Sequence, residues 1–361
     1  VLGLSLAGAP ESFSYRLEQG ELHIEPGSAD AEIAVELAPE DWRGLLSDLE
    51  SVPGILYGGR LRSHRGDLMQ FMRWERVLRA LYTGRPIYQP GAFELRSADG
   101  ARLDPAATFS LGDSAGQMRE FLDAAGYLLV KAVFTTAEID AMRSAADEVA
   151  AGARQGDQQS WWGRDAAGNA VLCRCLNGGT HPVLEPLYDD ARIQQLAALL
   201  PAGMRHSPPR EQDSITVVRK NPGVTEGLSD LPWHRDCGMG GHATMCPTFV
   251  FSLYLYDATA AAGCLQFLPG SHRYAFGFAD AGDVPGAVTV PAQAGDVTVH
   301  IGDVMHAAPP PTADAGTFRQ SILLAFHPEF DNHRGERHYN DVLLGDEQGQ
   351  VTHLRDRVKT P

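Results

Sequence analysis

Short strand-like runs near the beginning of this chain and from residue 215 onward, with helical patterns between them, predict a mainly β protein with flanking helices. Near the beginning, strand-like runs cover residues 13–17, 22–25 and 31–37. From residue 215 onward, short apolar runs are separated by proline and glycine, which is typical of a barrel or a sandwich. We therefore expect two regions of different texture within one chain.

Helical patterns lie between and after the first strand-like runs. An amphipathic segment over 39–49 begins at a proline, and a second one covers about 67–82, ending before a glycine. The polar stretch 97–104 then interrupts the pattern. The sequence predicts a small α+β N-terminal domain over residues 1–105 and a second, mainly β domain over 106–361.

The second region begins with helical elements. Residues 117–126 have a helical pattern, and 127–130 are apolar throughout, as in a buried strand. Thr135 with Glu138 three residues later predicts a capping box, which opens a helix that runs to about residue 152.

Composition narrows the classes of function. A net charge of −16 and a pI near 5.2 argue against nucleic acid as a partner and against a polybasic membrane patch, and favour a small-molecule substrate. No apolar run approaches the roughly 20 residues that span a bilayer. The first ten residues lack a basic leader, and the five cysteines have no disulfide-like spacing, so we expect a cytoplasmic protein with reduced thiols. Oligomeric state is not predicted.

The pair His234 and Asp236 is the first candidate for chemistry. Alternate residues of a strand share one face, so both side chains point the same way. His306 follows a strand and a tight turn and is our choice as a third ligand, in preference to His300, which is expected to be a core residue or to support a ligand. Two imidazoles and one carboxylate leave coordination positions open, as an oxygen-activating ferrous enzyme needs.

Arg319 and Ser321 are the second candidate. They lie thirteen and fifteen residues beyond His306 and share one face of an apolar strand. A guanidinium grips a carboxylate through two hydrogen bonds, and a hydroxyl adds a donor. The pair could therefore clamp a dicarboxylic co-substrate, although Arg319 could also serve in a structural salt bridge.

Several motifs in order resemble the phytanoyl-CoA dioxygenase superfamily of Fe(II)/2-oxoglutarate oxygenases, over about residues 117–327. They comprise the opening helix and strand at 121–130, the turn at 220–223 before the ligands, the signature Gly263-Cys264-Leu265-Gln266-Phe267-Leu268-Pro269-Gly270-Ser271-His272, a hairpin carrying the distal histidine, and the arginine strand. The resemblance implies a double-stranded β-helix of the jelly-roll or cupin-like type.

The same resemblance implies an activity and its cofactors. His234, Asp236 and His306 would hold Fe(II), Arg319 would bind 2-oxoglutarate, and O2 would be the oxidant in hydroxylation of a C–H bond, with release of succinate and CO2. Ser252 stands where the family often has tryptophan beside the co-substrate, and Tyr254 follows two residues later, so we expect both near 2-oxoglutarate. Arg235 replaces a frequent glutamine. Because Asp236 is present, halogenation is not expected.

Four residues are candidates for contact with the substrate: Trp161, Trp162, Arg235 and His242. The tryptophans are expected in a polar loop, where they either wall an apolar pocket or cap the core, and His242 lies in a glycine-rich loop after the ligands. We expect a mostly apolar substrate such as a lipid, an acyl derivative or a secondary metabolite.

The remaining alternatives stay open at this point. Residues 1–90 weakly resemble sterol-carrier-like domains, or are a packing extension of the catalytic domain. The same cofactors could support desaturation, epoxidation or ring formation. A non-redox metal cupin or a lipid-binding protein would also fit part of the pattern, although neither explains the Arg319 and Ser321 pair.

Overall fold

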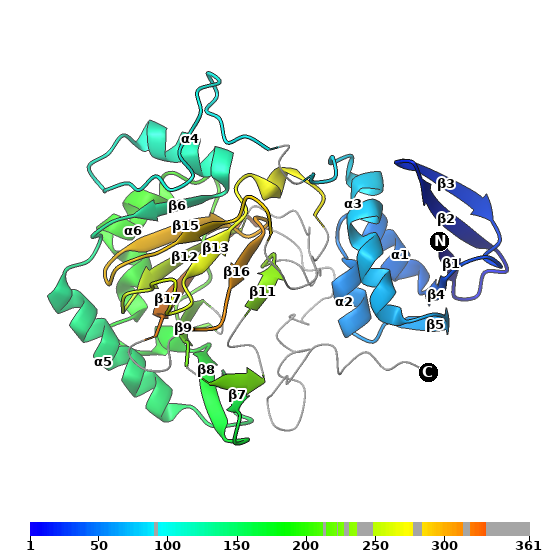
Figure 1. Ribbon diagram of the computed structural model, residues 1–361. Helices are drawn as coiled ribbons and strands as arrows, with labels where there is room; N and C mark the ends of the chain where they lie inside the picture. Colours follow the sequence, from blue (N-terminus) through cyan, green and yellow to red (C-terminus); the bar gives the residue numbers. More distant parts are fainter. Residues whose placement is uncertain are drawn as a thin grey trace.

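Three sheets form the framework of the protein (Figure 1). The computed structural model describes residues 1–89, 93–211, 214–221, 223–226, 231–236, 248–276, 284–312 and 318–329. One sheet belongs to the N-terminal region, and the other two, of eight and four strands, face each other in the second region. Strands paired in antiparallel fashion predominate, with helices on the outside, so the predicted fold class is confirmed.

The N-terminal region contains a five-stranded sheet with helices on one side. Its order is β3 (Glu21–Pro26), β2 (Ser12–Glu18), β1 (Leu2–Leu6), β4 (Ile33–Leu37) and β5 (Leu61–Arg65), with β1 and β4 parallel. Its own hydrophobic cluster joins the sheet to α1 (Pro39–Leu46), α2 (Val52–Tyr57), η1 (Leu68–Trp74) and α3 (Glu75–Thr83). The division of the chain at residue 105 stays a prediction.

The single helix predicted over 67–82 is two elements, a 3-10 segment (η1) followed by α3. Asp67 caps the first of these by accepting a hydrogen bond from the Met69 amide at 2.9 Å. Leu68 and Phe71 are both buried, and their spacing of three residues matches one 3-10 turn. The apolar stripe was therefore read correctly, but its period changes within the segment.

The elements that open the second region agree with the predictions. They are α4 (Ala115–Ala125), the fully buried strand β6 (Tyr127–Val130) and α5 (Thr136–Gly152). Thr135 and Glu138 form the predicted capping box at the start of α5.

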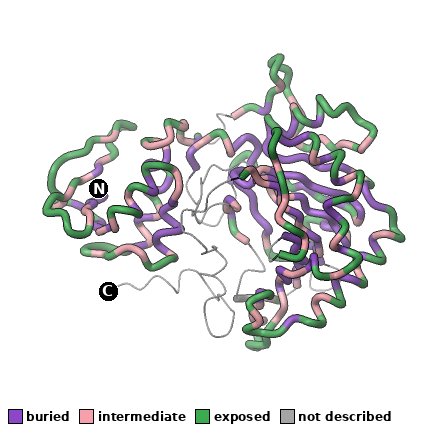
Figure 2. Tube along the Cα trace, turned by 180° about the vertical axis from the view of Figure 1, so that it is seen from behind, coloured by how far each residue is buried: buried purple, intermediate pink, exposed green. Residues whose placement is uncertain are grey.

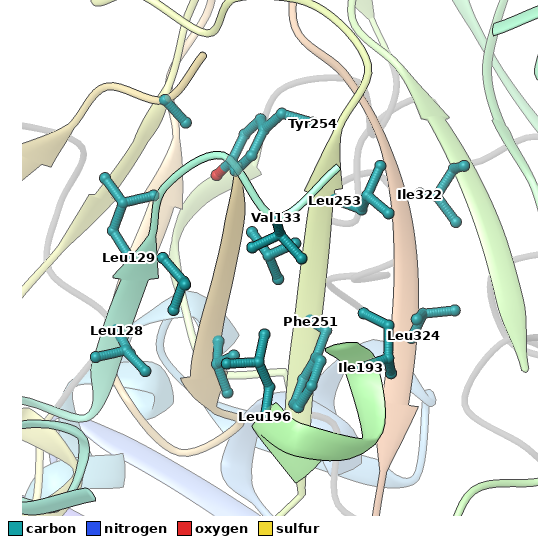
Figure 3. Close-up of a cluster of buried hydrophobic side chains, with 14 of the residues drawn as sticks. Leu128, Leu129, Val133, Ile193, Leu196, Phe251, Leu253, Tyr254, Ile322 and Leu324 are labelled. Atoms are coloured by element: carbon teal, nitrogen blue, oxygen red, sulfur yellow. The ribbon is translucent and has the colours of Figure 1, made fainter. Parts of the chain in front are cut away.

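The eight-stranded sheet carries the main core on its outer face. Its strands, in order, are β10 (Val224–Glu226), β7 (Ser160–Asp165), β8 (Ala170–Cys175), β9 (Ile215–Arg219), β17 (Gln320–Phe326), β12 (Phe249–Tyr254), β15 (Val297–Ile301) and β6. Phe251, Leu253, Ile322 and Leu324 pack here beside α6 (Ala191–Ala197), as Figure 3 shows. The alternate residues of these strands face the interior, where the site lies.

The four-stranded sheet closes the other side, in the order β11 (Leu231–His234), β16 (His306–Ala308), β13 (Leu265–Phe267) and β14 (Val288–Val290). The expected hairpin before His306 is not formed. β15 pairs with β12 and β6, whereas β16 pairs with β11 and β13, so the turn at Gly302 carries the chain from one sheet to the other. This crossing is what a double-stranded β-helix requires.

The N-terminal region packs against the second region through a third hydrophobic cluster. Tyr88 contributes to it together with Trp233 and Met305, which are the neighbours of two candidate metal ligands. Buried segments run through this contact between the two regions (Figure 2). Within the described residues, no helix is long and apolar enough to cross a membrane. The cellular compartment stays a prediction.

Candidate active site

His234 and His306 are brought together by strand pairing. They are direct partners in the antiparallel pair of β11 and β16, with their ring centroids 4.1 Å apart. His234 is the last residue of β11, and His306 is the first of β16. Two histidines 72 positions apart in the sequence therefore meet at one end of the smaller sheet.

Both imidazoles present the same nitrogen to the site. The Nδ1 of His234 lies 2.7 Å from the carbonyl oxygen of Pro232, and the Nδ1 of His306 lies 3.0 Å from that of Val304. A carbonyl oxygen only accepts, so each Nδ1 carries the proton and donates it. In the neutral form of each ring, the Nε2 then keeps its lone pair and faces the site, as a metal ligand needs.

Asp236 completes the cluster. Its Oδ1 lies 3.7 Å from His234 Nε2 and 3.5 Å from His306 Nε2, and its amide donates to the Gly302 carbonyl at 2.9 Å. Its Oδ2 lies 3.0 Å from the Nε2 of His300, which is buried. His300 thus contacts a candidate ligand. Of the two roles expected for it, a core residue or a support for a ligand, this contact matches the second.

The electrostatics suit metal binding at neutral pH. Burial lowers the pKa of His234, and the adjacent His306 lowers it further. Burial by itself would raise the pKa of Asp236, but the surrounding imidazoles, led by His306, hold it well below its usual range. His234 is therefore neutral and Asp236 is ionised, which is the state in which each can coordinate a cation.

The ligand set fits iron. One donor atom from each of His234, Asp236 and His306 lies within 4.8 Å of the others, and among the described residues this is the group that could hold a metal ion. Two imidazoles and a carboxylate form the facial arrangement of non-heme Fe(II) oxygenases. The group opens into a cavity, so positions remain for other ligands.

Three of the four predicted co-substrate residues line the same cavity. Arg319, Ser321 and Ser252 all contribute to it, and all three are buried. The hydroxyl of Ser321 is buried with no hydrogen-bond partner among the described residues, which a bound carboxylate would provide. Tyr254 is directly opposite Ser321 on the next strand, but its hydroxyl contacts Thr298 at 3.2 Å, and burial raises its pKa to about 12.

The structure describes three of the four predicted substrate residues and does not bring these three together. Trp161 and Trp162 lie in strand β7 and not in a loop, because each pairs with a residue of β8. Neither lines the cavity; Trp161 is buried, and the Nε1 of Trp162 donates to Ser160 at 2.8 Å. Arg235 points away from the cavity toward Asp303, and His242 lies outside the described residues.

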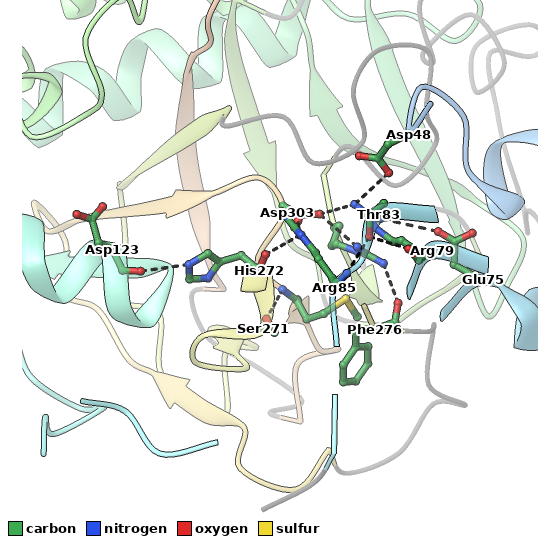
Figure 4. Close-up of polar contacts among 12 residues, drawn as sticks. Asp48, Glu75, Arg79, Thr83, Arg85, Asp123, Ser271, His272, Phe276 and Asp303 are labelled. Atoms are coloured by element: carbon green, nitrogen blue, oxygen red, sulfur yellow. Dashed lines mark hydrogen bonds and ion pairs between the residues drawn. The ribbon is translucent and has the colours of Figure 1, made fainter. Parts of the chain in front are cut away.

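Sequence reasoning missed a cluster of buried ion pairs behind the site (Figure 4). Asp303 contacts Arg79 at 3.1 Å and Arg235 at 3.2 Å, and Arg85 also binds it. Glu75 lies 3.8 Å from Arg79. The only signal in the sequence was a charged residue between His234 and Asp236, and its partners could not be found without the fold.

Comparison with known proteins identifies the family. The phytanoyl-CoA dioxygenase family model matches residues 122–320, which is more than half of the chain and contains all three candidate ligands. The chain belongs to this family. It is therefore an Fe(II)- and 2-oxoglutarate-dependent oxygenase, with iron and 2-oxoglutarate as its cofactor and co-substrate.

Several solved structures are similar to this chain, and the first of those named here supports the fold. The non-heme α-ketoglutarate-dependent carbocyclase SnoK from nogalamycin biosynthesis matches with a TM-score of 0.52 and 20% identity, over 69% of this chain and 98% of that one. EctD from S. alaskensis, solved with 2-oxoglutarate and 5-hydroxyectoine, has a TM-score of 0.49 and 20% identity over 68% and 87%. AviO1 from Streptomyces viridochromogenes Tue57 matches with a TM-score of 0.46 and 23% identity, over 60% of this chain and 98% of that one. No curated protein matches the sequence.

The N-terminal region is not explained by these matches. The family model begins at residue 122, and the suggested resemblance to sterol-carrier-like domains finds no support. The N-terminal region packs behind the site, where Tyr88 contacts the cluster that contains Trp233 and Met305. The alternative of a packing extension therefore remains as a prediction.

Proposed function

We propose that this oxygenase hydroxylates a C–H bond of a mostly apolar small molecule at an iron held by His234, Asp236 and His306. The observation that carries the proposal is that these three side chains open into one cavity with Arg319 and Ser321. A metal site and a carboxylate clamp that share a cavity are what a ferrous, 2-oxoglutarate-dependent reaction requires.

Each residue has a defined task in this proposal. Arg319 binds the far carboxylate of 2-oxoglutarate through its guanidinium, and Ser321 donates its otherwise unpartnered hydroxyl to the same group. Ser252 borders this position, whereas Tyr254 supports it from the sheet. His300 donates to Asp236 and so fixes the orientation of that carboxylate.

Bound iron and 2-oxoglutarate supply oxygen activation and C–H cleavage. In the overall reaction, one oxygen atom of O2 enters succinate as 2-oxoglutarate loses CO2, and the other becomes the hydroxyl of the product. The protein positions the reactants and limits water around them. The apolar part of the lining favours an apolar substrate: Val218, Leu231, Val250, Leu265, Ala308 and Leu323.

The test is turnover under 18O2 with a panel of lipids, acyl derivatives and aromatic secondary metabolites. We expect succinate to form in proportion to a product that is heavier by one 18O atom. The His234→Ala variant should form no succinate, while His181→Ala, which alters a histidine paired with Glu148 on α5, should behave as the parent. A product two hydrogens lighter, with no 18O, would contradict hydroxylation and favour desaturation or ring closure.

A further inference from the structure

Arg174 is a second arginine that lines the cavity. It lies on β8, and strand pairing places it in a row across the sheet with Trp161, Val218 and Ser321. Directly paired residues share one face of a sheet, so this row faces the metal ligands. Neighbouring strands are about 4.8 Å apart, so Arg174 is roughly 10 Å from Ser321 along the row.

The guanidinium of Arg174 lies over an aromatic ring, and no acidic residue that the structure describes pairs with it. Its carbon lies 4.5 Å from the centre of the Trp161 ring, in a cation–π contact. Trp161 itself is only 6% exposed, so the platform is fixed. No hydrogen bond or ion pair joins the side chain of Arg174 to any residue that the structure describes, so its guanidinium N–H donors can serve a ligand.

The charges in the cavity indicate what that ligand is. Two positive charges of ferrous iron and one of Arg319 balance the negative charge of Asp236 and the two of 2-oxoglutarate. A histidine that coordinates a metal does so in its neutral form, so His234 and His306 add no charge to this balance. After both cofactors are bound, the charge of Arg174 is the one left over among the residues that line the cavity. A half-buried cation with no acidic partner in the described part of the chain favours an anionic ligand.

We propose that Arg174 binds a carboxylate of the substrate, so that the substrate is an acid with an apolar body. This inference rests on the proposed function and narrows its substrate class. The guanidinium over Trp161 donates two parallel hydrogen bonds to a carboxylate, while the aliphatic lining holds the remainder of the molecule near the iron. Arg174 thereby determines specificity and orientation without taking part in bond cleavage.

A carboxylate of 2-oxoglutarate would bind the guanidinium of Arg174 in the same way as a carboxylate of the substrate. The experiment therefore distinguishes these two ligands. The protein is loaded with redox-inert Zn2+ and saturated with 2-oxoglutarate. Ligand-observed NMR then measures binding of two acids, hexanoate and 4-phenylbutyrate, and of their uncharged amides. The dissociation constant of 2-oxoglutarate is measured separately by calorimetry for each variant.

Three variants complete the design. Arg174→Met removes the charge and keeps the stem, and Arg174→Lys keeps the charge without the fork. Arg219→Met is the matched control, because Arg219 lies on the adjacent strand, next to Val218, and pairs with Asp147 at 2.7 Å on the outer face. Circular dichroism is used to check that each variant folds. If Arg174→Met does not fold, Arg174→Lys still tests the proposal.

In the parent and in Arg219→Met we expect each acid to bind roughly tenfold or more tightly than its amide, as charge-assisted hydrogen bonds predict. The preference should disappear in Arg174→Met and be partly kept in Arg174→Lys, with 2-oxoglutarate affinity changed less than about twofold.

Equal binding of acid and amide by the parent, or no detectable binding of either acid, would overturn the proposal. A tenfold loss of 2-oxoglutarate affinity in Arg174→Met would assign Arg174 to the co-substrate instead. Failure of the parent to bind 2-oxoglutarate at all would be a failure of the proposed function, and is thus a distinguishable result.

Discussion

Asp303 forms an ion pair at 3.2 Å with Arg235, the residue between the candidate ligands His234 and Asp236. Both side chains are almost completely buried. Asp303 also lies three residues before His306 and binds Arg79 of the N-terminal region. One carboxylate therefore joins the backs of both ligand-bearing segments to α3, and we expect its loss to disturb the metal site.

Replacing Asp303 with asparagine should reduce stability and metal affinity together. The substitution leaves the buried guanidinium groups of Arg79 and Arg235 without their shared counter-charge, a change that typically costs about 3–5 kcal/mol in unfolding free energy. Urea denaturation measures the loss, and titration with Zn2+ measures the affinity. Asp140→Asn is the control, because Asp140 is exposed and pairs only with Arg143. Equal effects of the two substitutions would contradict a coupling between this cluster and the site.

His300 should tune the metal without binding it. Its Nε2 donates to Asp236 at 3.0 Å, so His300→Leu frees one oxygen of a candidate ligand. Loss of such a supporting hydrogen bond typically lowers metal affinity by about 10–100-fold. Competition with a fluorescent chelator measures the change. Complete loss of binding would instead indicate that His300 is itself a ligand, and no change would show that the hydrogen bond has no role in orienting Asp236.

Ser321→Ala should weaken 2-oxoglutarate binding while leaving metal affinity intact. One neutral donor to a carboxylate contributes about 1.5 kcal/mol or more, which corresponds to roughly tenfold in affinity. Calorimetric titration of the Zn2+ form measures both constants. Ser271→Ala serves as a control hydroxyl, since it accepts from the Met305 amide away from the cavity. An unchanged constant for 2-oxoglutarate in Ser321→Ala would place the co-substrate elsewhere.

Stability should decrease in mildly acidic solution partly because of His272. Burial lowers its pKa to about 4, whereas an unfolded histidine titrates near 6.5. Between these values the unfolded chain binds a proton that the native protein does not, so the unfolding free energy falls as the pH falls from about 6.5 to 4. Urea denaturation as a function of pH should show a shallower decline in His272→Gln than in the parent. His23→Gln, at an exposed position, should retain the parental slope; equal slopes for all three would refute the assignment.

Local signals were enough to predict several elements. The capping box at Thr135 depends only on residues three positions apart, and the buried strand after α4 is apolar throughout. Alternation likewise predicted that His234 and Asp236 share one face. Such features are decided within a few residues of the chain, which is why the sequence alone reveals them.

Long-range pairing was not predictable in the same way. The expected hairpin before His306 failed because β15 and β16 join different sheets, although the turn between them looks like any tight turn. Trp161 was expected in a loop, yet its pairing with Arg174 places it in a strand and turns a suspected pocket wall into a platform. Arg79, a partner of Asp303, lies more than 200 positions away from it in the sequence, and no local pattern indicates that the two meet.

The assignment of iron and 2-oxoglutarate to one cavity is tested most directly by the visible charge-transfer band that forms when 2-oxoglutarate chelates ferrous iron. Fe(II) is added anaerobically to the apoprotein, then 2-oxoglutarate. We predict a band in the parent, a much weaker one in Arg319→Ala at the same concentrations, and none in Asp236→Ala. Tightly bound iron with no band in the parent, or an undiminished band in Arg319→Ala, would contradict the account of this site.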